Sequence, residues 1–545
     1  MIKTPFDRAV AALAAAAPLF DDGPAHQAKR QALAVVAQTQ LRDSPALARY
    51  HDVLLYLVAH PSDAGLLRAV EAELSRIARF LRERRGRHSD ALIDQGLPWV
   101  EMVMTFTHDF TRWLQSHPHC KQIIDSFDAD APADLNAILK LTLSSIEHAE
   151  TTAGMENDVL LDALGVPQNY RLNFILDELS RFDAQPYVKD QLYGALRLYT
   201  RITPTDRRFS KMYNRLPMPG KPFWQRSILR SFDSLAVINT PLPAPRPLKG
   251  AAQEEVIHVI KTSLVLTCRE TDPGTYLDPR TLRVMDLEHG LTVAVYGMQP
   301  QRQLALESYV GFTLFKNGMA AAYGGAWLFG PRAEFGMNIF EPYRGGESGF
   351  MMCQLLRTYR QLFGVSSFEV DAYQFGLNNP DGIASAAFWF YYRYGFRPMD
   401  PALARLAERE RAKMQRQPKH RSSKQTLMRF TGSNVALNFD SRKPTHPLDL
   451  MTPVTRMISR RFGGDRLAAE RECLAQFEAA TGSLSRLAPE ARPFTLEMAL
   501  VAKANRITDT AGLAILRSQA ECRADDLWRY QKGWFEFFAH LKSRA

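Results

Sequence analysis

The feature that most constrains this fold is a hairpin signal in the middle of the chain. Residues 309–316 are rich in aromatic and β-branched side chains, and a second strand-like run follows at 319–329. Between them, Asn317-Gly318 supplies the positive backbone angles that a two-residue turn requires. We therefore predict two antiparallel strands joined at this turn, and these strands need further partners to form a stable sheet.

The segments around the hairpin continue the sheet and add helices. Composition predicts strands at 256–267, 291–298, 334–340, 367–373 and 426–438 and helices at 350–363 and 383–394, the second of which ends at Gly395. Because strand and helix alternate after residue 334, part of the sheet is expected to be parallel. The predicted fold class is α+β, with a mixed sheet core between large helical regions.

Periodicity and composition divide the chain into four segments. Apolar residues recur at helical spacing up to about residue 235, whereas prolines cluster just beyond it. We predict a helical domain at 1–235, a proline-rich linker at 236–254, a mixed core at 255–440 and a helical region at 441–545. Within the core, residues 401–424 form a basic helical insertion that carries eight lysines and arginines.

Composition excludes several classes of protein. The five cysteines form no CxxC pair, and His117, His119 and Cys120 lack partners at a ligand spacing, so no metal site is predicted. No uncharged run reaches the roughly 18–20 apolar residues that span a bilayer, so we expect no membrane span and a cytoplasmic location. The net charge of +10 favours polyanionic partners only mildly over 545 residues.

A glycine-rich turn at 344–349 lies between a predicted strand and a predicted helix. Free N–H groups and the helix dipole at such a point favour an anion, most often phosphate. The residues predicted to hold this phosphate are Arg344, Gly345, Gly346, Ser348 and Gly349.

This region resembles the catalytic core of the GNAT acyltransferase superfamily over about residues 255–435. Arg344 and Gly349 fit the ends of the family's phosphate-binding motif, and Ala387, Tyr391 and Gly395-Phe396 resemble its later motif. The resemblance implies transfer of an acyl group to an amine, with no metal, from acyl-coenzyme A or a carrier protein bearing the same phosphopantetheine arm. The acyl group would lie in a V-shaped gap between the strands at 334–340 and 367–373.

The resemblance also implies catalytic roles for particular residues. Tyr391 stands where the family places the acid that protonates the leaving thiolate. The base that frees the amine is assigned to Glu341 or Glu334, with Glu369 and Asp371 as the other candidates.

The sequence departs from the family pattern at Glu347, which replaces the first glycine of the phosphate motif. A carboxylate there would repel phosphate unless its side chain turns away to bond Arg344 or Arg357. The pair of helices that normally follows the family's first strand is also missing, so the acceptor is not identified. Two alternatives stay open: an aminoacyl-tRNA-dependent peptidyltransferase that uses the basic insertion to bind RNA, and a non-catalytic scaffold.

Overall fold

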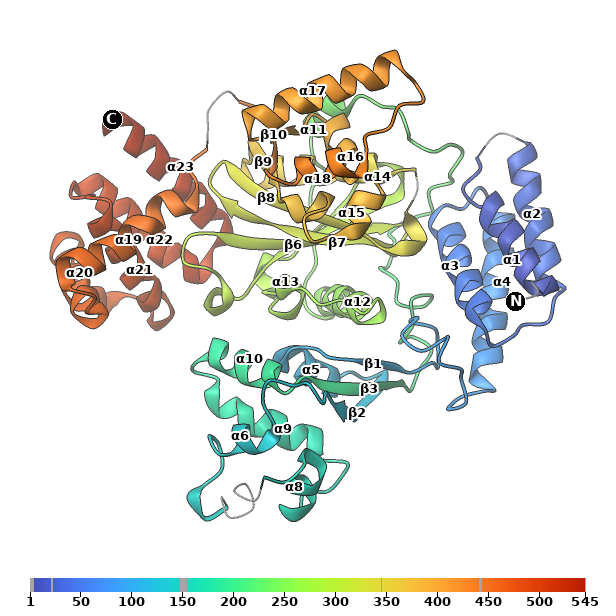
Figure 1. The fold of residues 1–545 in the computed structure, drawn as a ribbon, viewed down its shortest axis with the longest axis horizontal. Coiled ribbons are helices and arrows are strands. Elements are labelled where there is room, and N and C mark those ends of the chain that lie inside the picture. The colour runs from blue at the N-terminus through green and yellow to red at the C-terminus, as the bar shows by residue number, and fades with distance from the viewer. Residues whose placement is uncertain (1–3, 21–22, 148–153, 345, 441–443, 545) are drawn as a thin grey trace. The chain divides into compact units, whose positions relative to one another are not determined.

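The computed structural model describes residues 4–20, 23–147, 154–344, 346–440 and 444–544. The chain forms two compact units, whose elements are labelled in Figure 1. Unit 1 contains Met1–Ser227, Lys249–Thr275 and Lys316–Ala320, and unit 2 contains Ile228–Leu248, Tyr276–Phe315 and Ala321–Ala545. This division differs from the four sequential segments expected above, because parts of the middle of the chain belong to unit 1.

Unit 1 begins with four helices. In the last of them Asp63 caps the first turn, and Leu66, Val70, Leu74 and Ile77 are buried at helical spacing along one face. These helices are α1 (Pro5–Ala16), α2 (Pro24–Ala37), α3 (Pro45–Ala59) and α4 (Ala64–Arg82).

The rest of the N-terminal region is not entirely helical, so that prediction is wrong. Strands β1 (Met102–Met104), β2 (Cys120–Phe127) and β3 (Leu198–Pro204) form an antiparallel sheet in the order β1-β3-β2. Along β3, alternate side chains from Leu198 to Pro204 are buried, which is a strand pattern too short to stand out among helices. The same part of the chain holds α5 (His108–Gln115), α6 (Leu135–Leu139), α8 (Asn157–Ala163), α9 (Arg171–Leu179) and α10 (Pro186–Ala195).

The predicted strand at 256–267 is also wrong, because this segment belongs to helix α12 (Ala251–Leu266). Its β-branched residues favour a strand by composition. Its buried residues Val256, Val259, Ile260, Ser263 and Leu264 instead recur at the spacing of one helix face. The spacing of the buried residues is therefore a better guide to this segment than its composition. The short helix α13 (Asp272–Thr275) follows α12.

Unit 2 is built on an eight-stranded sheet in the order β10-β11-β9-β8-β7-β6-β5-β4. Strands β8 and β9 are parallel, whereas β4 and β5, β7 and β8, β9 and β11, and β10 and β11 pair antiparallel. The predicted mixed α and β fold is therefore confirmed. The strands are β4 (Arg283–Asp286), β5 (Leu291–Gly297), β6 (Ser308–Lys316), β7 (Met319–Phe329), β8 (Arg332–Ile339), β9 (Ser367–Val370), β10 (Arg397–Pro398) and β11 (Val435–Asn438).

The hairpin prediction is confirmed at β6 and β7. Asn317 and Gly318 have φ angles of 47° and 79°, as a turn with two left-handed residues requires. The strands predicted at 291–298, 334–340 and 367–373 are also present, as β5, β8 and β9.

The helices that accompany the sheet differ in detail from the predictions. Helix α14 (Ser348–Phe363) follows the glycine turn as expected. The helix predicted at 383–394 is divided into α15 (Pro380–Ala384) and α16 (Ala387–Arg393), because Ala386 adopts a left-handed conformation with a φ of 51°. The basic stretch forms α17 (Pro401–Arg416) and the start of α18 (Lys424–Phe430), so only the end of the strand predicted at 426–438 exists, as β11.

The proline-rich stretch is not a free linker. Its first part contains helix α11 (Ser234–Asn239), which packs against α14. The buried guanidinium of Arg357 donates to the carbonyl oxygens of Thr240 and Pro241, and Arg246 forms an ion pair with Asp286. These bonds hold the stretch against the sheet domain of unit 2.

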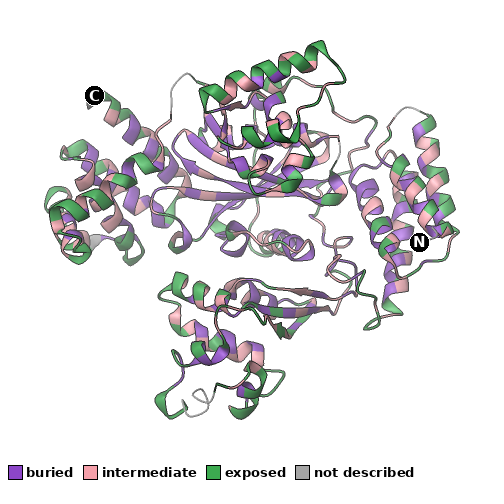
Figure 2. Cartoon of the chain, viewed as in Figure 1, coloured by how far each residue is buried: buried purple, intermediate pink, exposed green. Residues whose placement is uncertain are grey.

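The C-terminal region is helical in its described residues, as predicted. Its aromatic end is a packing face, because Tyr530, Trp534 and Phe538 are buried in one apolar cluster, and Figure 2 shows the mixture of buried and exposed positions along these helices. Within the described residues no helix is both long and apolar enough to cross a bilayer. The helices are α19 (Pro447–Phe462), α20 (Arg466–Thr481), α21 (Arg492–Ala504), α22 (Thr510–Asp525) and α23 (Leu527–Arg544).

Candidate functional site

The parallel strands β8 and β9 separate soon after they begin. They are paired only from Arg332 and Ser367 to Glu334 and Glu369. Beyond these residues β8 continues to Ile339 beside β7, whereas β9 ends at Val370. We call the space between residues 335–339 and the chain that follows β9 the strand divergence.

The side chain of Gln374 comes close to Gly336 of β8 across the strand divergence. A Cβ on Gly336 would lie 3.3 Å from the amide nitrogen of Gln374, which belongs to the 3-10 helix η7 (Ala372–Phe375) after β9. The absence of a side chain at Gly336 therefore lets the η7 segment come near the middle of β8.

Two of the four candidate bases belong to a buried ion cluster at the start of these strands. Arg332 is 2% exposed, and its guanidinium contacts carboxylate oxygens of Glu369 at 2.6 Å, Glu334 at 2.8 Å and Glu307 at 3.3 Å. Burial raises the pKa of Glu307, and Arg332 opposes this shift. Since Glu334 and Glu369 compensate the charge of Arg332, neither is free to act as a base.

The other two candidates lie at the far ends of the strands. Glu341 begins the 3-10 helix η6 (Glu341–Tyr343) directly after β8; it is exposed, and its side chain makes no hydrogen bond or ion pair with any described residue. Asp371 follows β9 and caps η7, since its carboxylate accepts the N–H of Tyr373 at 2.8 Å. Of the four candidate bases, Glu341 therefore has the fewest hydrogen bonds and ion pairs with described residues.

The glycine turn connects η6 to α14. Arg344 is exposed, and its Nε donates to the carbonyl oxygen of Ile339 at 3.1 Å, while Ser348 is the first residue of α14. Gly346 has a φ of 126°, which only glycine adopts easily. Gly345 lies outside the described residues.

Glu347 directly precedes α14, and the sequence leads us to expect that its carboxylate turns away to bond Arg344 or Arg357. Its side chain is 4% exposed and accepts the N–H of Leu229 at 3.4 Å. Arg357 instead pairs with Glu288 at 2.6 Å. The carboxylate is therefore directed toward the 228–232 segment.

The same segment covers the turn. A Cβ on Gly346 would lie 2.7 Å from the side chain of Ile228, and a Cβ on Gly349 would lie 1.7 Å from the hydroxyl of Tyr394. Phe232 stacks on Tyr394 with ring centroids 5.9 Å apart and meets Phe350 edge-on. We call residues 228–232 the covering segment. In this structure it and Tyr394 occupy the approach to the start of α14.

Tyr391 is buried among aromatic rings. Its neighbours Phe375, Phe390 and Phe396 lie with ring centroids 5.3–6.4 Å away, and its side chain is 4% exposed. Burial raises the pKa of its hydroxyl well above the ordinary value of 10.0. The hydroxyl makes no hydrogen bond to any described residue, so Tyr391 is a neutral, buried phenol.

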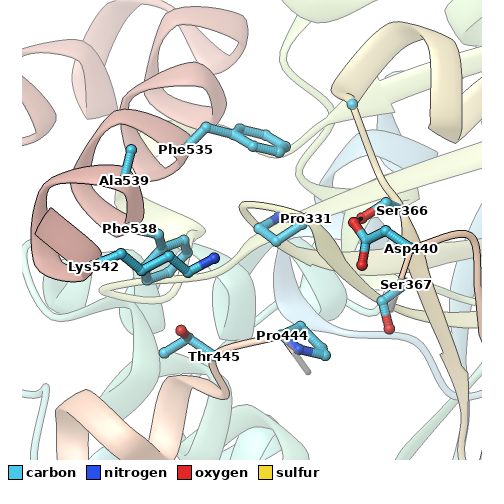
Figure 3. A pocket seen from close by; sticks show the side chains of 11 residues that line it. Pro331, Ser366, Ser367, Asp440, Pro444, Thr445, Phe535, Phe538, Ala539 and Lys542 are labelled. Atoms are coloured by element: carbon cyan, nitrogen blue, oxygen red, sulfur yellow. Dashed lines mark hydrogen bonds between the residues drawn. The ribbon is translucent and has the colours of Figure 1, made fainter. Parts of the chain in front are cut away.

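A separate hollow lies at the opposite end of the strands. It has a volume of 330 Å³ and lies between α23 and the residues at the start of β9, as Figure 3 shows for Phe535, Lys542 and Ser366. The hydroxyl of Ser366 donates to Asp440 at 2.8 Å. Because ligands of open α/β sheets bind at the carboxyl ends of strands, this hollow does not fit the predicted acyl site.

Unit 1 contains a histidine cluster that the sequence revealed only in part. His258 of α12 lies beside His117 and His119, which the sequence analysis noted. Its ring centroid is 4.3 Å from that of His117 and 6.2 Å from that of His119. Cys120 is buried, which raises the pKa of its thiol to about 12. No group of three or more potential ligands in the described chain has a geometry that could hold a metal ion. The sequence did not reveal that His258 joins this cluster, because its segment was predicted to be a strand and is in fact helix α12.

Comparisons of the chain with protein-family models, with curated proteins and with solved structures gave no match.

Proposed function

We propose that this chain is an acyltransferase, which moves an acyl group from a phosphopantetheine-linked thioester to an amine. The observation that carries the proposal is the separation of β8 from β9 just before the glycine turn and α14. A thioester can reach the edge of such an opening while its phosphate is held by N–H groups at the start of the helix. The buried Tyr391, with its unbonded hydroxyl, belongs to α16, the second α-helix after the glycine turn's helix α14.

The proposed reaction is a direct attack. The acceptor nitrogen bonds to the thioester carbonyl carbon, the carbon–sulfur bond breaks, and the sulfur leaves as a thiolate. Glu341 takes the proton that the amine loses, and Tyr391 gives its proton to the thiolate. Glu334 and Glu369 are assigned a positioning role, since their ion pairs with Arg332 fix the point at which the strands part.

Donor binding requires movement at the turn. The Tyr394 hydroxyl and Ile228 lie where a phosphate would approach Gly349 and Gly346. We propose that the donor displaces the covering segment and the Tyr394 side chain. A donor from a carrier protein presents one phosphodiester, which tolerates Glu347 better than the pyrophosphate of coenzyme A does.

The test combines calorimetry with thiol release. Acetyl-coenzyme A and an acetylated carrier protein are each titrated into the full chain, and free thiol is then followed after a mixture of primary amines is added. Saturable heat with one donor and amine-dependent thiol release are expected. No heat at millimolar donor and no thiol release would support the scaffold alternative and end the proposal.

Tyr391→Phe tests the assignment of the acid. Only the leaving-group proton is lost, so turnover should fall by about 100-fold or more while the donor dissociation constant stays within about twofold. Tyr199→Phe is the matched control, because Tyr199 is an exposed tyrosine in β3 of unit 1. Equal turnover in wild type and Tyr391→Phe would remove this residue from the mechanism.

A further inference from the structure

A hollow lined by arginines lies between α16 and α17, away from the groups assigned above. It has a volume of 660 Å³, and its lining includes Arg393, Arg397, Arg411 and Arg421 but no aspartate or glutamate. We call it the arginine hollow. A space of this size holds a ligand of several hundred daltons rather than a single ion.

The four positive charges are not neutralised by the protein. Among the described residues none of these arginines forms an ion pair. Arg397 and Arg421 each donate one nitrogen to backbone carbonyl oxygens, and Arg397 stacks on the ring of Tyr392 at 3.9 Å. Guanidinium groups gathered without carboxylates form a site for phosphate, which they bind with paired N–H donors.

Aromatic rings complete the lining. Trp389 and Phe390 are half-buried, and the indole N–H of Trp389 donates to the hydroxyl of Ser422 at 3.1 Å. Trp389 also meets Phe430 edge-on, with ring centroids 5.8 Å apart. These contacts fix the indole, and its partly exposed surface is available to another ring.

Helix α17 also carries cations on the side turned away from the hollow, which it lines with Arg411 and Met414. Arg405, Arg409, Lys413 and Arg416 are exposed and lie at intervals of four, four and three residues, which places them on one face over about 16 Å. Figure 2 shows the exposed positions along this helix. The buried Glu410 is already bonded to Lys413 and His420. Cations therefore lie on both sides of α17, and an extended polyanion can contact both sides whereas a single small ligand in the hollow cannot.

We infer that the arginine hollow and the exposed face of α17 bind single-stranded nucleic acid. Phosphodiester groups contact the arginines, and one unstacked base lies against Trp389. An acidic protein surface would match the charge but would leave the aromatic lining without a purpose. This inference does not depend on the acyl-transfer proposal, because it uses neither the glycine turn nor Tyr391.

The test is binding of a labelled 12-nucleotide single strand, as RNA and as DNA of the same sequence, measured by fluorescence anisotropy over a salt series. The double variant R411Q/R421Q should lower the slope of log affinity against log salt by about 1.4, since each phosphate contact on a single strand contributes about 0.7. Trp389→Leu should weaken binding about fivefold or more. R456Q/R460Q is the matched control, because both residues are exposed on α19.

Each outcome decides the matter. Binding of both strands supports recognition of backbone and base, and binding of RNA alone supports the inference with RNA as the ligand. No binding at low salt, or equal losses in the control variant, would overturn it. Polyglutamate that competes as well as RNA, with Trp389→Leu unchanged, would also overturn it and indicate an acidic protein partner. Circular dichroism of each variant verifies that the fold is intact.

Discussion

Arg332 is the residue on which the geometry of the proposed site depends. Its guanidinium holds three carboxylates, one from β8, one from β9 and one from the chain before β6. A buried charge is tolerated only while such partners compensate it. The cluster therefore links the point of strand separation to a neighbouring strand, although Arg332 and Glu369 are 37 residues apart.

Removal of Arg332 should be strongly destabilising. Arg332→Met leaves the buried Glu369 and the half-buried Glu307 and Glu334 without their shared cation, and the loss of one partner from such a cluster costs about 3–5 kcal/mol in the free energy of unfolding. The loss should be smaller at pH 5 than at pH 8, because burial raises the pKa of Glu307, and protonation of this carboxyl relieves its repulsion with the other two. Urea unfolding at the two pH values measures both effects.

The control for this change is Arg461→Met, which removes an ion pair to Glu472 whose arginine side chain is 51% exposed. A surface pair of this kind contributes at most about 1 kcal/mol. If Arg332→Met costs no more than Arg461→Met, the cluster does not stabilise the strands.

At the scale of elements, segments were predictable where the signal was local. Asn317-Gly318 specifies its turn without reference to the rest of the chain, and β5 to β9 follow from short runs of strand-forming residues. Helix α12 was missed because its β-branched composition was given more weight than its helical period. Gly346 and Gly349 marked the glycine turn correctly.

The cover over that turn was beyond prediction from sequence. Leu229 contacts Glu347 across 118 residues of chain, and nothing in either segment signals the other. The ion pairs that Arg332 forms with Glu334 and Glu369 likewise required knowledge of the strand register. Such long-range pairings decide which candidate residues are free to react.

The covering segment should compete with the donor, if the acyl-transfer proposal is correct. Phe232→Ala removes the ring that packs on Tyr394 and Phe350, and an aromatic pair contributes about 0.5–1.5 kcal/mol. The open form becomes more populated, so the donor should bind about two- to tenfold more tightly in calorimetry.

Leu235→Ala, an exposed position in α11, controls for a general effect of truncation near this segment. Unchanged or weaker donor binding in Phe232→Ala, with normal binding in the control, would contradict a competing role for the covering segment.

At the scale of the whole molecule, the stability of unit 1 depends on pH through a histidine cluster. The histidine cluster of unit 1 contains His117, whose Nδ1 accepts the N–H of His119 and whose Nε2 lies 3.1 Å from the hydroxyl of Thr262. This arrangement requires a neutral ring. Burial, together with the neighbouring His258 and His119, lowers the pKa of His117 to about 3.

Acid should therefore weaken unit 1 through this cluster. The ordinary histidine pKa of 6.5 lies above the value in the folded state, so the unfolded chain binds more protons as pH falls below 6.5, and stability is lost from there toward about pH 3. For His117 alone the loss of stability at pH 5.5 is about 1.4 kcal/mol.

His117→Gln should remove this part of the pH dependence, whereas His446→Gln, a change in unit 2, should not. Hydrogen exchange of α12 peptides at pH 7.5 and 5.5, corrected for intrinsic rates, reports the loss where it arises. Equal protection of α12 at both pH values in the wild-type chain would show that protonation of the cluster does not lower the stability of unit 1. The buried, neutral state of these histidines would then not contribute to that stability.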